Sequence, residues 1–155
     1  LERAGAEFGL LAANTPHIVF DELARESPIP LISIVEATAA EARRHGWKRL
    51  GLFGTRFTMA GAFYNAVFAR AGLSLVVPGA ADQAYLHDKY MNELFVGTFL
   101  PETGAGLLTI IDHLKAREEI DAVILGGTEL PLILRDADHN GLPLITRRES
   151  TSKQQ

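Results

Sequence analysis

The feature that most constrains this fold is a strand, turn and helix pattern between Leu10 and Leu23. Residues 8–13 form an apolar run of the length of a buried strand, which Asn14-Thr15-Pro16 then interrupts. Threonine is suited to cap a helix and proline to its first position. We therefore expect a helix over 16–25 whose first N–H groups point past the strand's end, where they favour an anion such as a carboxylate.

The same order of elements recurs near the other end of the sequence. Residues 122–145 run from an apolar strand through Gly126-Gly127-Thr128 and an apolar helical turn to another strand. Both copies close alike, on Ile29-Pro30-Leu31-Ile32 and on Leu142-Pro143-Leu144-Ile145. Two such corners facing each other across a cleft would permit chemistry on both sides of one small molecule. The alternative is two ordinary strand-to-helix corners of one sheet.

Strands alternate with helices along the sequence, which predicts an α/β fold with a parallel sheet flanked by helices. Strands are expected over 31–34, 49–53, 73–77, 121–125 and 143–146, helices over 35–45, 59–71, 85–96 and 107–119, and a loop over 97–106. Ligands of such sheets bind beyond the carboxyl ends of the strands. The turns at 13–17, 54–59 and 126–129 are therefore the candidate site.

The composition restricts the class of partner. The 155 residues are 47% hydrophobic and 22% charged, which is typical of a soluble globular protein. A formal net charge of -4, without a basic run longer than a pair, argues against nucleic acid. No apolar segment approaches the roughly 20 residues that span a bilayer, and no leader opens the sequence. We expect a cytoplasmic protein, away from membranes, with small molecules or proteins as partners.

Several kinds of site are excluded or disfavoured. The sequence has no cysteine, which removes disulfides, thiolate metal sites and thiol nucleophiles. His87, Asp88 and His113 lack the spacing of a metal site and are interpreted as solvated helix residues. The turn at 54–58 lacks the spacing of a phosphate loop, so it favours generic anion binding over nucleotide binding. Neither a metal nor a cofactor is expected.

The three turns also carry a recognisable series of motifs. Ala13-Asn14-Thr15-Pro16-His17 is similar to Cys-Asn-Thr-x-His, residues 125–132 (LGGTELPL) to a Gly-Cys-Thr-Glu-hydrophobic run, and residues 51–59 (GLFGTRFTM) to the strand and turn between them. In this order and spacing, they resemble the aspartate/glutamate racemase family of cofactor-independent amino-acid racemases. The resemblance covers nearly the whole sequence.

This resemblance implies two similar α/β domains with the site between them, and a homodimer. We expect residues 1–34 and 141–155 to belong to the first domain and residues 35–140 to form the second. The first domain is expected to lack its N-terminal part. The sequence opens on the pattern of a helix end, and an α/β sheet normally has a strand before such a helix.

The resemblance further implies an isomerase that works without pyridoxal phosphate. In the family, one cysteine from each domain flanks the α-carbon: one thiolate removes the α-proton and the opposite thiol delivers a proton to the other face. Ala13 and Gly127 stand at the two cysteine positions, and neither can move a proton. Because losing one acid or base costs about a hundred- to ten-thousand-fold in rate, the activity is expected to be lost or altered.

Other residues of the turns keep alternatives open. His17 and Glu129 match groups that the family retains, so they are candidate supporting groups, and with Thr15 or Thr128 candidate replacement bases. The expected substrate-binding residues are Asn14, Thr15, Thr55, Thr58 and Thr128, for which turn capping is the alternative. Three functions remain: an altered racemase, a non-catalytic binder or sensor of a small amino acid or dicarboxylate, and an interaction module with a vestigial pocket.

Overall fold

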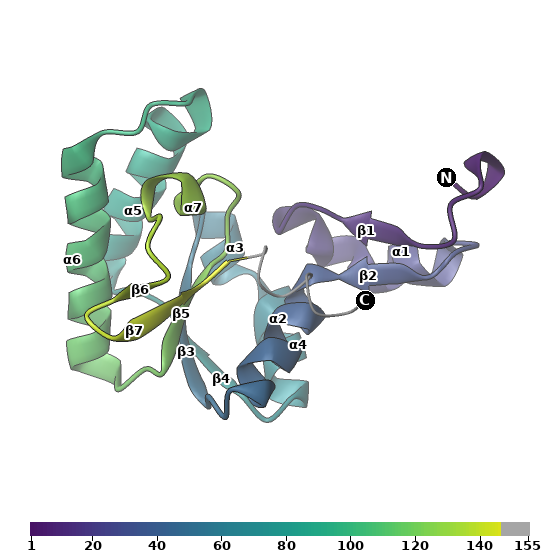
Figure 1. The fold of residues 1–155 in the computed structure, drawn as a ribbon, viewed down its shortest axis with the longest axis horizontal. Coiled ribbons are helices and arrows are strands. Elements are labelled where there is room, and N and C mark those ends of the chain that lie inside the picture. The colour runs from purple at the N-terminus through teal and green to yellow at the C-terminus, as the bar shows by residue number, and fades with distance from the viewer. Residues whose placement is uncertain (147–155) are drawn as a thin grey trace.

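The computed structural model describes residues 1–146, and its strands alternate with helices (Figure 1). The strands are β1 (Gly9–Leu11), β2 (Leu31–Ser33), β3 (Arg49–Phe53), β4 (Ser74–Val76), β5 (Ala122–Leu125), β6 (Asp138–His139) and β7 (Leu142–Ile145). The α-helices are α1 (Phe20–Glu26), α2 (Ile34–Arg44), α3 (Arg56–Ala60), α4 (Ala62–Arg70), α5 (Ala80–Asn92), α6 (Pro101–Glu118) and α7 (Leu130–Ile133). Short 3-10 helices are η1 (Glu2–Ala4), η2 (Thr15–Val19) and η3 (Leu94–Val96). The predicted α/β class is confirmed.

The larger sheet has five strands in the order β4-β3-β5-β7-β6, and only β6 is antiparallel to its neighbour. Successive side chains of a strand point to opposite faces. Leu50 and Leu52 of β3 accordingly pack in one core with α2 and α4, whereas Phe53 packs in the other with α5 and α6. These helix pairs lie on opposite sides of the sheet (Figure 1). All of β5 is buried, so this strand lies at the centre of the fold.

The other two strands, β1 and β2, form a small parallel sheet of their own. Both copies of the predicted repeat run from a strand through a helical segment to a parallel strand, and the second copy has the additional strand β6 before β7. Strands β1 and β2 are joined through η2 and α1, strands β5 and β7 are joined through α7, and each pair is parallel. Each copy therefore begins a helical segment just beyond the carboxyl end of its first strand, as the sequence predicts. The predicted cap is wrong: η2 begins at Thr15 itself, its N-cap is Asn14, and the Asn14 side chain makes no capping hydrogen bond.

The expected domain division differs from the structure at β7. Residues 141–155 are expected in the domain of residues 1–34, but β7 pairs with β5 of the larger sheet, with Val123 opposite Leu144. The physical reason is burial: Leu142 and Leu144 complete the core that α5 and α6 share. Residues 147–155 lie outside the described part of the chain. The division into two domains otherwise remains a proposal.

Several helices also differ from the predicted boundaries. The helix expected over 16–25 is the 3-10 helix η2 followed by α1, and the one expected over 85–96 is α5, which begins at Ala80 and ends at Asn92, followed by η3. The expected helix over 59–71 is divided, because Gly61 is extended (φ -68, ψ 129) and separates α3 from α4. The expected loop over 97–106 contains the start of α6 at Pro101. Its glycines lower helix propensity and hide the helix in the sequence. At Gly106 a Cβ would lie 2.3 Å from the Tyr85 hydroxyl oxygen, so α5 and α6 approach each other closely there.

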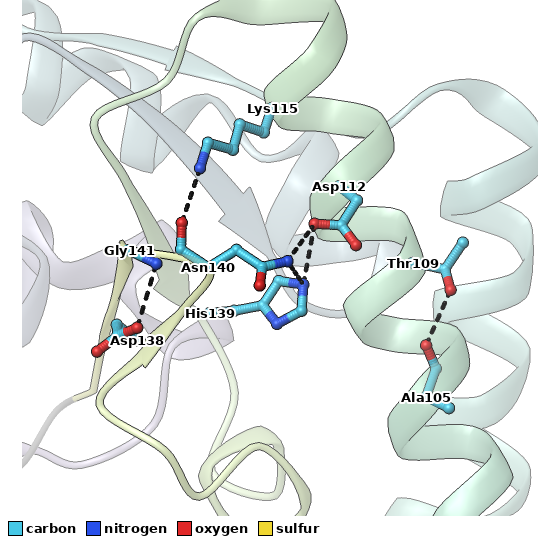
Figure 2. Close-up of polar contacts among 8 residues, drawn as sticks. All are labelled: Ala105, Thr109, Asp112, Lys115, Asp138, His139, Asn140 and Gly141. Atoms are coloured by element: carbon cyan, nitrogen blue, oxygen red, sulfur yellow. Dashed lines mark hydrogen bonds and ion pairs between the residues drawn. The ribbon is translucent and has the colours of Figure 1, made fainter.

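A polar cluster attaches the hairpin of β6 and β7 to α6 (Figure 2). Asn140 and Gly141 have positive φ angles of 52 and 75, which suits a two-residue hairpin turn. Asp112 Oδ1 on α6 lies 2.9 Å from His139 Nε2 and accepts a hydrogen bond from Asn140 Nδ2 at 3.3 Å. Lys115 Nζ donates to the Asn140 carbonyl oxygen at 3.0 Å. These contacts hold β7 in register against the helix layer.

Candidate functional site

A cavity of about 320 Å³ lies where the two copies of the repeat approach each other. Asn14, from the turn after β1, lines it together with Gly127 and Thr128, from the turn after β5. Arg135 and Asp136, which follow α7, also line it. The structure thus brings the first and third predicted turns to one cavity, and adds a cation and an anion from a loop that the sequence analysis did not select.

Asn14 is held in place by a tyrosine of helix α4. The Tyr64 hydroxyl of α4 donates a hydrogen bond to Asn14 Oδ1 at 2.6 Å, and both side chains line the cavity. Burial raises the pKa of Tyr64 above its usual value, so the phenol stays protonated and remains a donor. With its oxygen accepting from Tyr64, the Asn14 amide has its NH₂ group to offer as a donor.

The environment of Gly127 is set by Tyr90 of α5. A Cβ at position 127 would lie 2.3 Å from the Tyr90 hydroxyl oxygen and 2.7 Å from its Cε2, closer than real Cβ contacts. The same hydroxyl donates a hydrogen bond to Glu129 Oε2. Burial, and then the neighbouring Glu129, raises the pKa of Tyr90. A buried phenol therefore fills the space that a side chain at position 127 would need.

His17 lies outside this cavity. It is buried in η2, and its Nδ1 lies 2.8 Å from the Ala13 carbonyl oxygen, while Ala13 itself is exposed in the turn after β1. Desolvation lowers the pKa of His17, against the opposing effect of its backbone hydrogen bonds. The ring is stacked on Phe20 at a centroid distance of 5.1 Å. His17 lines a different cavity.

The middle turn forms a helix cap. The Thr55 hydroxyl accepts a hydrogen bond from the Thr58 backbone N–H at 3.3 Å, and the two hydroxyl oxygens also lie 3.3 Å apart. Thr58 is buried, Thr15 is exposed in η2, and Glu129 is half-buried. The residues that line the first cavity do not include Ala13, Thr15, His17, Thr55, Thr58 or Glu129. The capping alternative therefore describes the local role of Thr55.

Four residues near the site were not predicted from the sequence: Tyr64, Tyr90, Arg135 and Asp136. The two tyrosines carry no local signal, since they stand on helices far along the chain from the turns that they contact. Arg135 follows a short apolar helix and reads as an ordinary surface residue. Its Nε donates to the Leu132 carbonyl oxygen at 2.8 Å, which places the guanidinium beside the cavity.

Neither a metal site nor a membrane-spanning helix is found within residues 1–146. Within that range, no three His, Asp or Glu side chains come close enough together to hold a metal ion. In the same range, no helix has both the length and the hydropathy needed to cross a bilayer.

The fold and the paired turns agree with the comparison with known proteins. The model of the Asp/Glu/Hydantoin racemase family matches residues 1–147, and the chain belongs to this family. The predicted family resemblance is therefore confirmed.

Individual relatives show the same relationship. The chain is 27% identical to a glutamate racemase of Aquifex aeolicus, over 99% of this chain and 59% of that protein. It is also 27% identical to a broad specificity amino-acid racemase of Bacillus subtilis, over 94% of this chain and 61% of that protein. A crystal structure of an aspartate racemase homologue from Pyrococcus horikoshii superposes with a TM-score of 0.83 at 36% identity, over 96% of this chain and 65% of that chain. The chain thus spans about three fifths of the length of these curated relatives.

Proposed function

We propose that the cavity between the two turns binds a small amino acid or dicarboxylate, and that this chain does not racemise it by the two-thiol mechanism. Membership of the family supports an amino-acid racemase-like function. The observation that carries the loss of chemistry is the Tyr90 phenol, which fills the space at Gly127 where the second thiol is expected.

The acid and base groups near the cavity support this proposal. Racemisation needs one group that takes the α-proton and a second that delivers a proton to the opposite face. Ala13 has only a methyl group, and Gly127 has no side chain. The raised pKa of Tyr90 makes it a poor base at neutral pH, and Glu129 already accepts the Tyr90 hydrogen bond. His17, the other candidate base, lines a different cavity.

The groups that line the cavity are those that a dicarboxylate or an amino acid requires. The Arg135 guanidinium, the Thr128 hydroxyl and the Asn14 amide are donors for carboxylate oxygens. The Asp136 carboxylate is the acceptor suited to an α-ammonium group. The cavity volume of about 320 Å³ is at the small end of ligand pockets, as expected for a ligand the size of aspartate.

Titration calorimetry with L-aspartate, L-glutamate and L-malate tests this binding role. Arg135→Gln is expected to weaken binding about tenfold or more, because it removes the charge-assisted donor. Arg43→Gln, at an exposed site on α2 outside this cavity, is the matched control and should bind as the unmodified protein does. The proposal fails if none of the acids binds, or if both variants lose the same affinity.

The reaction and assembly of the protein are part of the same proposal. We infer a cytoplasmic homodimer in which the cavity serves as a sensor or binding site. The competing proposal, an altered racemase with another base, requires α-proton exchange without cysteine. A pocket that binds no acid, in a chain that associates with a partner, would favour the interaction module instead.

A further inference from the structure

A second cavity, of about 290 Å³, lies on another side of the same junction. It is formed by η2 and the start of α1, by the residues around the start of α2, and by one face of α4. It shares no lining residue with the first cavity. Nothing in the proposed function uses it.

The second cavity is lined by a buried histidine, one ring nitrogen of which lacks a hydrogen-bond partner among the described residues. The His17 side chain is 5% exposed, and its Nε2 has no hydrogen-bond partner among the described residues. Because Nδ1 lies 2.8 Å from the Ala13 carbonyl oxygen, which can only accept, Nδ1 carries the proton. In the neutral ring Nε2 is then an acceptor, and the lowered pKa of His17 keeps the ring neutral at pH 7. A buried acceptor without a donor calls for a donor from a ligand or water.

The charged groups of the cavity also favour a cation. Asp21 and Glu36 contribute two carboxylates, whereas Arg70 contributes the one cationic side chain. Arg70 Nη2 lies 4.0 Å from Glu36 Oε1, at the outer limit of an ion pair. The three charges therefore sum to -1, so the side chains that line the cavity carry a net negative charge.

The remaining wall of the cavity is apolar. Phe63, Ala66 and Val67 of α4 line it on one side and Ile18 of η2 on the other, and Ile18 is 71% exposed. Burial of apolar surface here would add a favourable contribution for any ligand with a short hydrocarbon part.

We propose that this second cavity binds a small organic ammonium ion, a primary amine with a short apolar group. The ammonium group donates to His17 Nε2 and to the carboxylates of Asp21 and Glu36, and the hydrocarbon part packs against Ile18 and the apolar face of α4. Because the two cavities have no residue in common, this binding does not rest on the amino-acid site.

Three probes of one shape test the charge requirement: butylammonium chloride, sodium butyrate and 1-butanol, each titrated into the full chain with NMR shifts as the readout. Butylammonium is expected to bind most tightly, with shifts at residues 17–21, 33–36 and 62–70. Butyrate binding equal to or tighter than butylammonium would overturn the proposal, as would an absence of shifts at these residues.

Two tryptophan variants locate the binding. Ala66→Trp fills the cavity from an exposed position of α4 and should abolish butylammonium binding. Ala69→Trp, exposed on the same helix but outside the cavity lining, is the matched control and should leave the Kd unchanged. Equal effects of the two variants on the butylammonium Kd would contradict binding in the second cavity.

A charge variant completes the test. Glu36→Gln is expected to raise the butylammonium Kd about two- to fivefold, the range of an exposed charge pair, and to leave the Kd of 1-butanol unchanged. Aspartate binding to the first cavity, measured on the same samples, should be unaffected by all three variants. A Kd for butylammonium that does not respond to Glu36→Gln would contradict the ammonium assignment.

Discussion

At the scale of single residues, the contact between Tyr90 and Gly127 decides what the turn after β5 can contain. The Tyr90 hydroxyl oxygen lies only 2.3 Å from the position of a Cβ at residue 127, and the hydroxyl also donates to Glu129. The sequence shows the glycine but not the phenol, because the two residues meet only when α5 packs on β5. A substitution at Gly127 therefore has to be designed together with Tyr90.

The first prediction concerns this contact. Gly127→Ala should destabilise the fold by about 1–3 kcal/mol, the cost of overpacking, because the buried tyrosine must move. Gly104→Ala is the matched control: its Cβ would lie 3.5 Å from Ile133 Cγ1, an ordinary contact, and alanine gains about 1 kcal/mol over glycine in a helix. Urea unfolding measures both. Equal free energies of unfolding for Gly127→Ala and the unmodified protein would contradict the packing described for Tyr90.

The second prediction concerns Tyr64, which connects α4 to the turn after β1. Tyr64→Phe removes the hydrogen bond to Asn14 Oδ1 and should cost about 1 kcal/mol of stability. Because Asn14 lines the first cavity, the affinity for aspartate should fall as well. Tyr85→Phe, at a partly exposed ring on α5, should change stability by no more than about 0.5 kcal/mol. A loss of stability that is no larger in Tyr64→Phe than in Tyr85→Phe would refute the role of this bond.

At the scale of elements, the cluster of Figure 2 couples α6 to the hairpin of β6 and β7. The hydrogen bond with His139, and next that with Asn140, lowers the pKa of Asp112 against the effect of desolvation. A carboxyl group whose pKa is lower in the folded state stabilises the fold above its unfolded pKa of about 3.9. This contribution is lost as the pH falls through the lower, folded pKa.

The third prediction follows from that pH dependence. Because the Asp112 side chain is 48% exposed, solvent screens its contacts, and Asp112→Asn should cost only about 0.2–1 kcal/mol at pH 6. The difference between variant and unmodified protein should shrink as the pH falls below 3.9 and the Asp112 carboxyl is protonated. Denaturant unfolding across this range measures it. A difference that grows as the pH falls has the wrong sign for this coupling.

Most elements were predictable from the pattern of apolar residues and from the turn residues between them. The exceptions have physical causes. β3 was predicted with its observed bounds, because an apolar run between polar residues marks a buried strand. The division of the 59–71 helix was missed because it depends on the extended backbone of Gly61, and the early start of α6 was missed because its glycines lower helix propensity.

At the scale of the whole molecule, the site lies between the two copies of the repeat. Two parallel strand, turn, helix and strand units approach each other, and a cavity lined by Asn14 and Thr128 lies between them, as the sequence motifs suggested. The sheet to which β7 belongs was not predictable. Burial of Leu142 and Leu144 places β7 in the larger sheet and not in the sheet of β1 and β2. His17, chosen from the motif, lines the second cavity instead.

The most direct test of the central claim, an acid-binding cavity without racemisation chemistry, is proton NMR of L-aspartate in deuterated water. The unmodified protein is compared with Ala13→Cys/Gly127→Cys, and with the same pair combined with Tyr90→Leu to make room at residue 127. We predict binding without loss of the α-proton signal for the unmodified protein, and the fastest exchange in the variant that also carries Tyr90→Leu. Exchange by the unmodified protein at an ordinary enzymatic rate would contradict the claim.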